Sequence, residues 1–278
     1  MNNKQNRLMR RRFLRQSAAA VLAAGLWPGA RTLRAAKGNA KAEPFDFVVV
    51  NDTHYRDARC GDYLTKAFSQ IQSEESKPEL ILLAGDLATD GRKKELGPVK
   101  DLLSAVKCPV YVTPGNHDYE PNKSGKQYDA IFPKRRNYVV EHKGWNLLCY
   151  DSTLHVKYGG VAVQPNTLAW LDKTLPKLDR GQPMIVFTHF PLGDGVPMRS
   201  TNGDAVLKRF AKHNLRAVFT GHFHGLTEKK HGEIPICGNR CLAFSRGNHD
   251  GSKEKGYFVA RAEAGKVSHK FKEFLPTG

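Results

Sequence analysis

Five short apolar runs in the chain are each followed closely by side chains that can bind a metal ion. The runs cover residues 47–50, 80–84, 108–114, 184–188 and 215–219. The side chains that follow them are Asp52 and His54, Asp86, Asn116, His189, and finally His222 and His224. Carboxylate and amide oxygens together with imidazole nitrogens are the ligand types that hold divalent or trivalent transition-metal ions. One histidine after an apolar run is common by chance, whereas five such junctions in one chain indicate a metal centre.

These apolar runs have the length and the flanking residues of buried β-strands. They are bounded by Gly or Pro, as strands of an α/β sheet often are. Residues 62–75 and 93–106 carry apolar side chains at helical spacing, which gives the order strand, helix, strand, helix, strand. That order predicts a parallel sheet covered by helices, and such sheets bind their ligands at the carboxyl ends of the strands. Asp86 and Asn116 are therefore expected side by side at one edge of the sheet.

The remainder of the chain predicts further elements of the same α/β kind. Residues 115–136 are polar and rich in Lys, Tyr and Asn, which predicts a loop over the site. A strand is expected at 145–150, with helices at 167–175 and 205–212. Short β-like runs follow residue 234 and end in a hairpin that pairs 256–262 with 267–274. At 278 residues and 40% apolar content, the chain is long enough to bury a full core.

The ordered blocks D-x-H, G-D, G-N-H-D, a lone His and G-H-x-H resemble the signature of the calcineurin-like metallophosphoesterase superfamily. They extend from Asp52 to His224 and therefore cover most of the chain after residue 42. Within the superfamily, residues 85–90, 150–152 and 168–171 are most similar to the bacterial cyclic-nucleotide phosphodiesterase group. The resemblance implies one α/β domain at residues 43–278, a four-layer α/β/β/α sandwich of the metallophosphoesterase type.

The resemblance also implies a centre of two divalent or trivalent metal ions, with Fe, Mn or Zn as the expected metals. It assigns Asp52, His54 and His224 to the first ion, and Asn116, His189 and His222 to the second. Asp86 bridges both, because a carboxylate has lone pairs for two ions. Asp52 with His54 and His222 with His224 stand at positions i and i+2, which face the same side of an extended segment. The two ions would activate a water as hydroxide and hold the phosphoryl oxygens during in-line attack.

His117 is not among these ligands and is expected to act on the substrate. Its neighbour Asn116 points to the metal, so His117 is predicted to face the pocket as a proton donor or a stabiliser of phosphoryl charge. The alternative is a histidine that supports the ligands from behind. Asp90 is a candidate to orient it, although related phosphatases carry that acid one residue earlier, where this chain has Thr89. Purple acid phosphatases have an iron-binding Tyr at the position of Thr89, so a non-purple metal pair is expected.

A second Gly-Asn-His-Asp sequence at residues 247–250 copies the first one at residues 115–118. It comes after the last metal block and is followed by Gly-Ser-Lys, a composition typical of a loop. We interpret it as a coincidence or as a loop on the substrate side, and we assign no metal ligand to it.

Residues 1–42 differ in kind from the rest of the chain. They hold ten Lys or Arg and no Asp or Glu, and residues 10–15 (RRRFLR) resemble a twin-arginine export motif before a short apolar region at 17–27. Ala40-Lys41-Ala42 suits cleavage by a signal peptidase. The segment predicts export to the periplasm by the twin-arginine machinery. The alternatives are a basic amphipathic helix or a membrane anchor, although the apolar region is too short to span a bilayer.

After residue 42 the chain holds 34 Lys or Arg and 27 Asp or Glu, a formal net charge of +7. This charge can attract phosphorylated substrates, but no basic run interleaved with aromatic residues is present, and no specific nucleic-acid partner is inferred. The predicted function is metal-dependent hydrolysis of P–O bonds in a phosphodiester or cyclic-nucleotide-like ester. The alternatives are an exported phosphomonoesterase and a metal- or phosphate-binding module without activity. The sequence leaves the oligomeric state open.

Overall fold

The structure is a computed structural model that describes residues 42–276. The predicted export signal at residues 1–42 lies outside the described residues, apart from Ala42. Within the described range, no helix is both long enough and apolar enough to cross a membrane.

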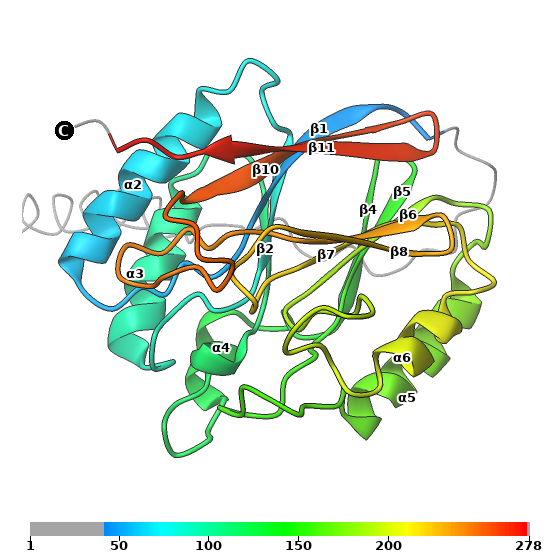
Figure 1. Cartoon of the computed structure of the whole chain (residues 1–278), viewed down its shortest axis with the longest axis horizontal. Helices are drawn as coiled ribbons and strands as arrows, with labels where there is room; N and C mark the ends of the chain where they lie inside the picture. Colours follow the sequence, from blue (N-terminus) through cyan, green and yellow to red (C-terminus); the bar gives the residue numbers. More distant parts are fainter. Residues whose placement is uncertain (1–41, 277–278) are drawn as a thin grey trace, which may run out of the picture. The chain divides into compact units, whose positions relative to one another are not determined.

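The first of two sheets contains the strands that carry the Asp and Asn residues of the predicted site (Figure 1). Its strands are β1 (Phe45–Val50), β2 (Leu80–Ala84), β3 (Val110–Thr113), β10 (Gly256–Glu263) and β11 (Lys266–Glu273). Their order across the sheet is β11-β10-β1-β2-β3, and β1, β2 and β3 are parallel. The predicted C-terminal hairpin is confirmed, because β10 and β11 pair antiparallel.

The second sheet carries the remaining histidines. Its strands are β4 (Tyr138–His142), β5 (Trp145–Cys149), β6 (Met184–Thr188), β7 (Leu215–Thr220), β8 (Thr227–His231) and β9 (Ile234–Gly238). They lie in the order β4-β5-β6-β7-β9-β8, and the four inner strands are parallel. The carboxyl ends of β6 and β7 therefore lie at the same edge of this sheet.

Helices cover the outer face of each sheet (Figure 1). Those on the first sheet are α2 (Ala58–Gln72), α3 (Lys93–Ser104) and α4 (Lys126–Ile131). Those on the second are α5 (Pro165–Thr174) and α6 (Gly203–Arg209). Two short 3-10 helices complete the chain order: η1 (Asn116–Asp118) follows β3, and η2 (Leu175–Lys177) follows α5. Three apolar cores separate the layers, one between the sheets and one beneath each set of helices. The predicted four-layer α/β/β/α sandwich is confirmed.

Alternate residues of β1 contact different layers. Phe47 and Val49 belong to the core between the sheets, whereas Val48 and Val50 belong to the core beneath the helices. Because both faces of such a strand are buried, its sequence is a continuous apolar run rather than an alternating one. The continuous apolar runs in the sequence therefore mark the strands that precede the site residues.

The structure differs from the predicted elements at several places, and neither β4 nor β8, the two edge strands of the second sheet, was predicted. Helix α2 begins at Ala58 rather than at residue 62, because the Asp57 carboxylate caps it by accepting hydrogen bonds from two backbone N–H groups. The predicted loop at 115–136 contains η1 and α4. Strand β8 is missing from the prediction because it is a polar, largely exposed strand at the sheet edge.

Candidate metal centre

The carboxyl ends of strands from both sheets meet at the candidate site. In the first sheet, Asp52 and His54 follow β1, Asp86 follows β2 and Asn116 follows β3; in the second, His189 follows β6, and His222 and His224 follow β7. Backbone hydrogen bonds extend the pairing of β1 and β2 into these loops, since the His54 N–H donates to the Asp86 carbonyl at 2.9 Å. All seven side chains are buried. The structure therefore brings together every residue that the sequence predicts as a ligand.

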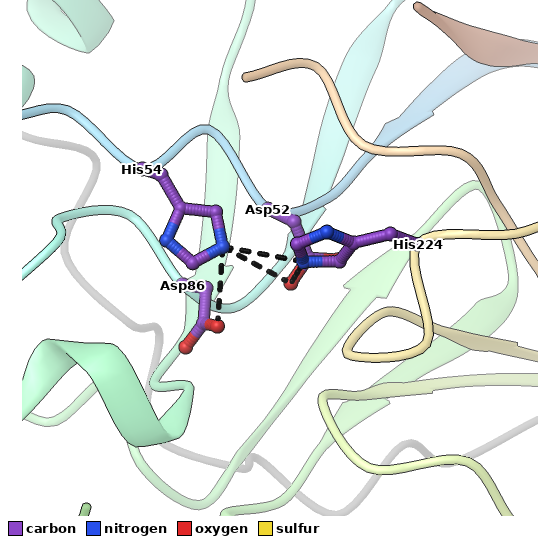
Figure 2. Close-up of side chains that lie close together, drawn as sticks. All are labelled: Asp52, His54, Asp86 and His224. Atoms are coloured by element: carbon purple, nitrogen blue, oxygen red, sulfur yellow. Dashed lines mark hydrogen bonds and ion pairs between the residues drawn. The ribbon is translucent and has the colours of Figure 1, made fainter. Parts of the chain in front are cut away.

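Four of these residues form a group that we call cluster 1: Asp52, His54, Asp86 and His224. Figure 2 shows their side chains pointing toward one another from three separate loops. One ligand atom from each residue lies within 4.8 Å of those of the other three. The Nε2 atoms of His54 and His224 are 3.2 Å apart, and His224 Nε2 is 3.1 Å from an Asp52 oxygen. These four donor atoms surround one point.

A second group, cluster 2, contains Asp86, His189 and His222. His189 Nε2 lies 3.4 Å from Asp86 Oδ1 and 3.2 Å from the side-chain oxygen of Asn116. The other Asp86 oxygen, Oδ2, lies 3.4 Å from His54 Nε2 in cluster 1. The Asp86 carboxylate is therefore shared by the two clusters, with one oxygen toward each.

The donor atoms have the spacing of groups that share a cation. Metal–ligand bonds of about 2.0–2.2 Å place neighbouring donors about 3–3.5 Å apart. The contacts His54–His224, His54–Asp86, His224–Asp52 and His189–Asp86, at 3.1–3.4 Å, fall in this range, whereas His54 and Asp52 lie 4.0 Å apart. Two imidazole nitrogens that face each other, as those of His54 and His224 do, are best satisfied by a cation between them. The residues present therefore fit a pair of divalent ions.

Backbone carbonyls orient three of the four imidazoles. The ring nitrogens directed away from the clusters contact carbonyl oxygens of Ala84, Tyr158 and Gly247, at 2.9 Å for His189, 2.8 Å for His222 and 3.0 Å for His224. A carbonyl oxygen can only accept, so each of these nitrogens carries the proton. The other nitrogen of each neutral ring is left unprotonated, which is the form that binds a metal.

The loops that carry the ligands are bent rather than extended. Asp52, His54, Asp86, His222 and His224 have φ angles of 54°, 43°, 53°, 66° and 48°. This left-handed region is uncommon for residues other than glycine and costs on the order of 1 kcal/mol or more at each position. The side chains at positions i and i+2 do converge, as predicted. The predicted cause, an extended backbone, is wrong, because these residues have left-handed φ angles.

Two motif glycines are required by close approach to the ligands. A Cβ atom on Gly115 would lie 2.0 Å from an oxygen of Asp86, and one on Gly221 would lie 2.6 Å from an oxygen of Asp52. No side chain can be accommodated at those distances. The Gly of G-N-H-D and the Gly of G-H-x-H thus allow their loops to pack directly against the carboxylates of Asp86 and Asp52.

The buried charges of cluster 1 compensate one another. Burial acts to raise the pKa of Asp52, but the neighbouring imidazoles, His224 foremost, hold that pKa well below its usual range. Burial acts to lower the pKa of His224, but the Asp52 carboxylate raises it to about 11. For His54 the effect of burial outweighs that of the nearby Asp86 and Asp52 carboxylates, and it lowers the pKa of His54 to about 3. At neutral pH the cation-free cluster therefore holds its positive charge on His224.

His117 is held beside cluster 1 without belonging to it. Its backbone N–H donates to Asp86 Oδ1 at 2.8 Å, and its Nδ1 lies 2.7 Å from the Thr89 carbonyl oxygen. The ring is partly buried and stands edge-on to His54, with ring centroids 4.8 Å apart. Asp90 does not orient it: that carboxylate lies 3.6 Å from the guanidinium of Arg92. The candidate role of Asp90 is therefore corrected, and the Thr89 carbonyl takes its place.

Asp118, the last residue of the first Gly-Asn-His-Asp, is a supporting residue that the sequence analysis did not identify. Its fully buried carboxylate accepts hydrogen bonds from the N–H groups of Ala88 and Gly115, at 2.9 and 2.8 Å. Burial and the charge of Asp86 raise the pKa of Asp118 to about 7. The side chain joins the loops after β2 and β3, and its acidic identity within the motif was the available signal.

The second Gly-Asn-His-Asp lies beside cluster 1. The Gly247 carbonyl is the group that orients His224. Asn248 does not enter either cluster, because its amide bonds within its own loop, donating to the Glu254 carbonyl at 2.8 Å and accepting from the Cys241 N–H at 3.1 Å. Among the described residues, the two ligand groups contain no residue of this copy.

Metal uptake should release protons and strengthen as pH rises. A metal binds the neutral imidazole, whereas the raised pKa of His224 keeps it protonated at pH 7 in the cation-free protein. Below that pKa, each released proton should increase the apparent Mn²⁺ affinity by about tenfold per pH unit. Calorimetric titrations in buffers of different ionisation enthalpy measure both the affinity and the proton count. An affinity that stays constant between about pH 6 and 8 would contradict the charge assignment.

Comparisons with known proteins agree with this geometry. The family model of the calcineurin-like phosphoesterases matches residues 45–226. The glycerophosphodiester phosphodiesterase GpdQ of Enterobacter lignolyticus is 28% identical over 211 residues, which cover 67% of this chain and 73% of that protein. The 3′,5′-cyclic adenosine monophosphate phosphodiesterase CpdA of Escherichia coli K12 is 26% identical over 163 residues, covering 55% of this chain and 57% of that protein.

A solved structure shares the fold. GAP50, the anchor in the inner membrane complex of Plasmodium, superimposes with a TM-score of 0.62 at 13% identity, covering 83% of this chain and 84% of that one. Identity at this level carries the fold alone. The family model, in contrast, spans more than half of the chain and contains every block of the ordered motif. The chain therefore belongs to the calcineurin-like phosphoesterase family.

Proposed function

We propose that the protein is a metal-dependent phosphoesterase that hydrolyses P–O bonds in phosphodiesters or cyclic-nucleotide-like esters. The observation that carries this proposal is the Asp86 carboxylate, which directs one oxygen to each of two clusters of metal-binding side chains. The family membership and the names of two relatives, both phosphodiesterases, support the substrate class.

In this proposal the seven buried side chains hold two ions. Asp52, His54 and His224 would hold the first, Asn116, His189 and His222 would hold the second, and Asp86 would contribute one oxygen to each. Two bound ions would supply Lewis acidity, which activates a water molecule and offsets charge on the phosphoryl oxygens. Iron, manganese and zinc all accept such mixed oxygen and nitrogen sets. Thr89 lies in neither cluster and donates its hydroxyl to the His54 carbonyl at 3.0 Å, which supports a non-purple pair.

The position of His117 supports a role as proton donor to the departing oxygen. The Thr89 carbonyl accepts from Nδ1 and thereby fixes the orientation of the ring. With Nδ1–H donated to that carbonyl, the second ring nitrogen, Nε2, gives a proton to the substrate from the doubly protonated form of the ring. A module that only bound metal or phosphate would need neither this residue nor its fixed orientation, which favours an enzyme over the inactive alternative.

A panel of nitrophenyl monoesters, nitrophenyl diesters and cyclic nucleotides, tested with the Mn²⁺-loaded protein, tests the proposed function. Diesters or cyclic nucleotides should be hydrolysed faster than monoesters, and Asn116→Ala should abolish most of the activity because it removes an oxygen beside His189. Asn214→Ala is the matched control, since its amide bonds to the Gly181 carbonyl at the opposite end of β7. A preference for monoesters would establish the phosphomonoesterase alternative, and a lack of all turnover would reject the enzyme.

His117→Ala should slow the hydrolysis of alkyl or nucleoside esters far more than that of nitrophenyl esters. An alkoxide leaves poorly without a proton, whereas a nitrophenolate needs no such help, and general-acid assistance contributes about 10²–10⁴ in rate. The measurement is kcat for both substrate types, together with metal content to verify that both ions stay bound. Equal losses for the two types would instead identify His117 as a stabiliser of phosphoryl charge.

We also propose that the protein is exported to the periplasm by the twin-arginine machinery. The support is the composition of residues 1–42, with paired arginines before a short apolar region and no acidic residue. That route carries folded proteins, which suits a site assembled from loops of two sheets.

Replacing Arg10 and Arg11 together by Lys should retain the precursor inside the cell. Lysine keeps the positive charge, so the double substitution tests recognition of the arginine pair rather than charge alone. Cell fractionation followed by immunoblotting measures the distribution. Export at the normal level would point to another route or to a different role for the segment.

A further inference from the structure

Four imidazoles form a row through cluster 1: His117, His54, His224 and His249. The separations between neighbouring ring centroids are 4.8, 5.1 and 5.3 Å along this order. The two inner rings are the buried metal-binding pair, whereas the outer two belong to neither cluster. His117 comes from the first Gly-Asn-His-Asp and His249 from the second, so each copy of the motif supplies one of the two outer rings.

The loop of the second copy is fixed to His224 by two backbone contacts. The His249 N–H donates to the His224 carbonyl at 3.0 Å, and the Gly247 carbonyl contacts His224 Nδ1 at 3.0 Å. Asp250 ties the far side of the loop, because its carboxylate accepts from the Leu226 N–H at 3.1 Å and from Arg240 Nε at 3.0 Å. The backbone of His249 therefore has a defined position beside cluster 1.

The ring of His249 is exposed and retains its hydrogen-bonding capacity. It packs face to face with Phe223, at 6.2 Å and 26°, and against His224, at 5.3 Å and 32°. Among the described residues, neither ring nitrogen of His249 has a hydrogen-bond partner.

We propose that His249 is a second substrate-contacting residue, whose imidazole edge donates a hydrogen bond to an anionic oxygen of the phosphate ester held at cluster 1. This inference rests on the proposed function, since it places a phosphoryl group at the clusters. An oxyanion is the ligand that such a site attracts, and an imidazole N–H is a suitable donor to it. His249 has no side-chain hydrogen bond to fix its ring as Thr89 fixes His117, so it serves binding rather than proton transfer to the leaving group.

The test compares His249→Ala and His249→Gln with His231→Ala, all as Mn²⁺-loaded protein. His231 is an exposed histidine at the end of β8 and serves as the matched control. His249→Ala should raise KM and the inhibition constant of inorganic phosphate by the same factor, about tenfold or more, for nitrophenyl and alkyl diesters alike. Metal content should not change. His249→Gln, which keeps a donor, should recover part of the loss, and His231→Ala should match the unaltered protein.

Three outcomes would overturn this assignment. Loss of metal in His249→Ala would mean that the residue only positions His224. A larger loss for alkyl than for nitrophenyl diesters would make it a leaving-group acid, and unchanged KM and phosphate inhibition would mean that it does not touch the substrate. If the unaltered protein cleaves no phosphate ester, the proposed function fails, and calorimetric binding of inorganic phosphate to the unaltered protein and to His249→Ala still decides whether His249 contacts the anion.

Discussion

Asp86 places an ionised carboxylate in the interior of the protein, where an unpaired charge costs several kcal/mol, roughly, even after relaxation. Its side chain is almost completely buried, and burial by itself would raise its pKa. The neighbouring imidazoles, His189 first among them, keep that pKa lowered, and the His117 N–H donates to one of its oxygens. Because each oxygen faces a different cluster, the other ligands are arranged around this one group. Two cations would complete the compensation that the imidazoles begin.

The spacing of the ligands around Asp86 depends on how the two sheets pack. Asp86 extends from the first sheet and His189 from the second, so the distance between them is set by the apolar core between the sheets. Phe47 and Phe219 pack edge-on across that core, with ring centroids 5.9 Å apart. Close packing of such residues resists small changes of volume. The packing of the two sheets therefore determines the geometry of the site, since neither sheet alone contains a complete cluster.

The positions of the candidate ligands follow from short, buried, parallel strands, whereas the four-layer arrangement is implied by the family resemblance. A polar residue directly after such a strand has to emerge at the sheet edge, and this places Asp86 and His189 without knowledge of side-chain conformations. Sequence reasoning could not predict the left-handed backbone at Asp52 and His54, which depends on pairing between the loops after β1 and β2. It also could not predict that the Thr89 carbonyl contacts His117 Nδ1. Every residue has a main-chain carbonyl, so the residue type does not indicate which carbonyl accepts a hydrogen bond.

The two copies of Gly-Asn-His-Asp show why residue identity alone does not fix a role. In the first copy, Asp118 satisfies the backbone N–H groups of two loops, and the oxygen of Asn116 remains free to face His189. In the second, the amide of Asn248 itself satisfies backbone groups of its loop, so it has no oxygen to offer a cation. The Asn248 oxygen accepts from both the N–H and the thiol of Cys241, which occupies the two lone pairs that a cation would need. In both copies the histidine, His117 or His249, keeps an imidazole nitrogen without a hydrogen-bond partner in the described part of the chain. Because the backbone of each histidine is held beside cluster 1, this nitrogen is placed to contact a phosphate ester in our proposals.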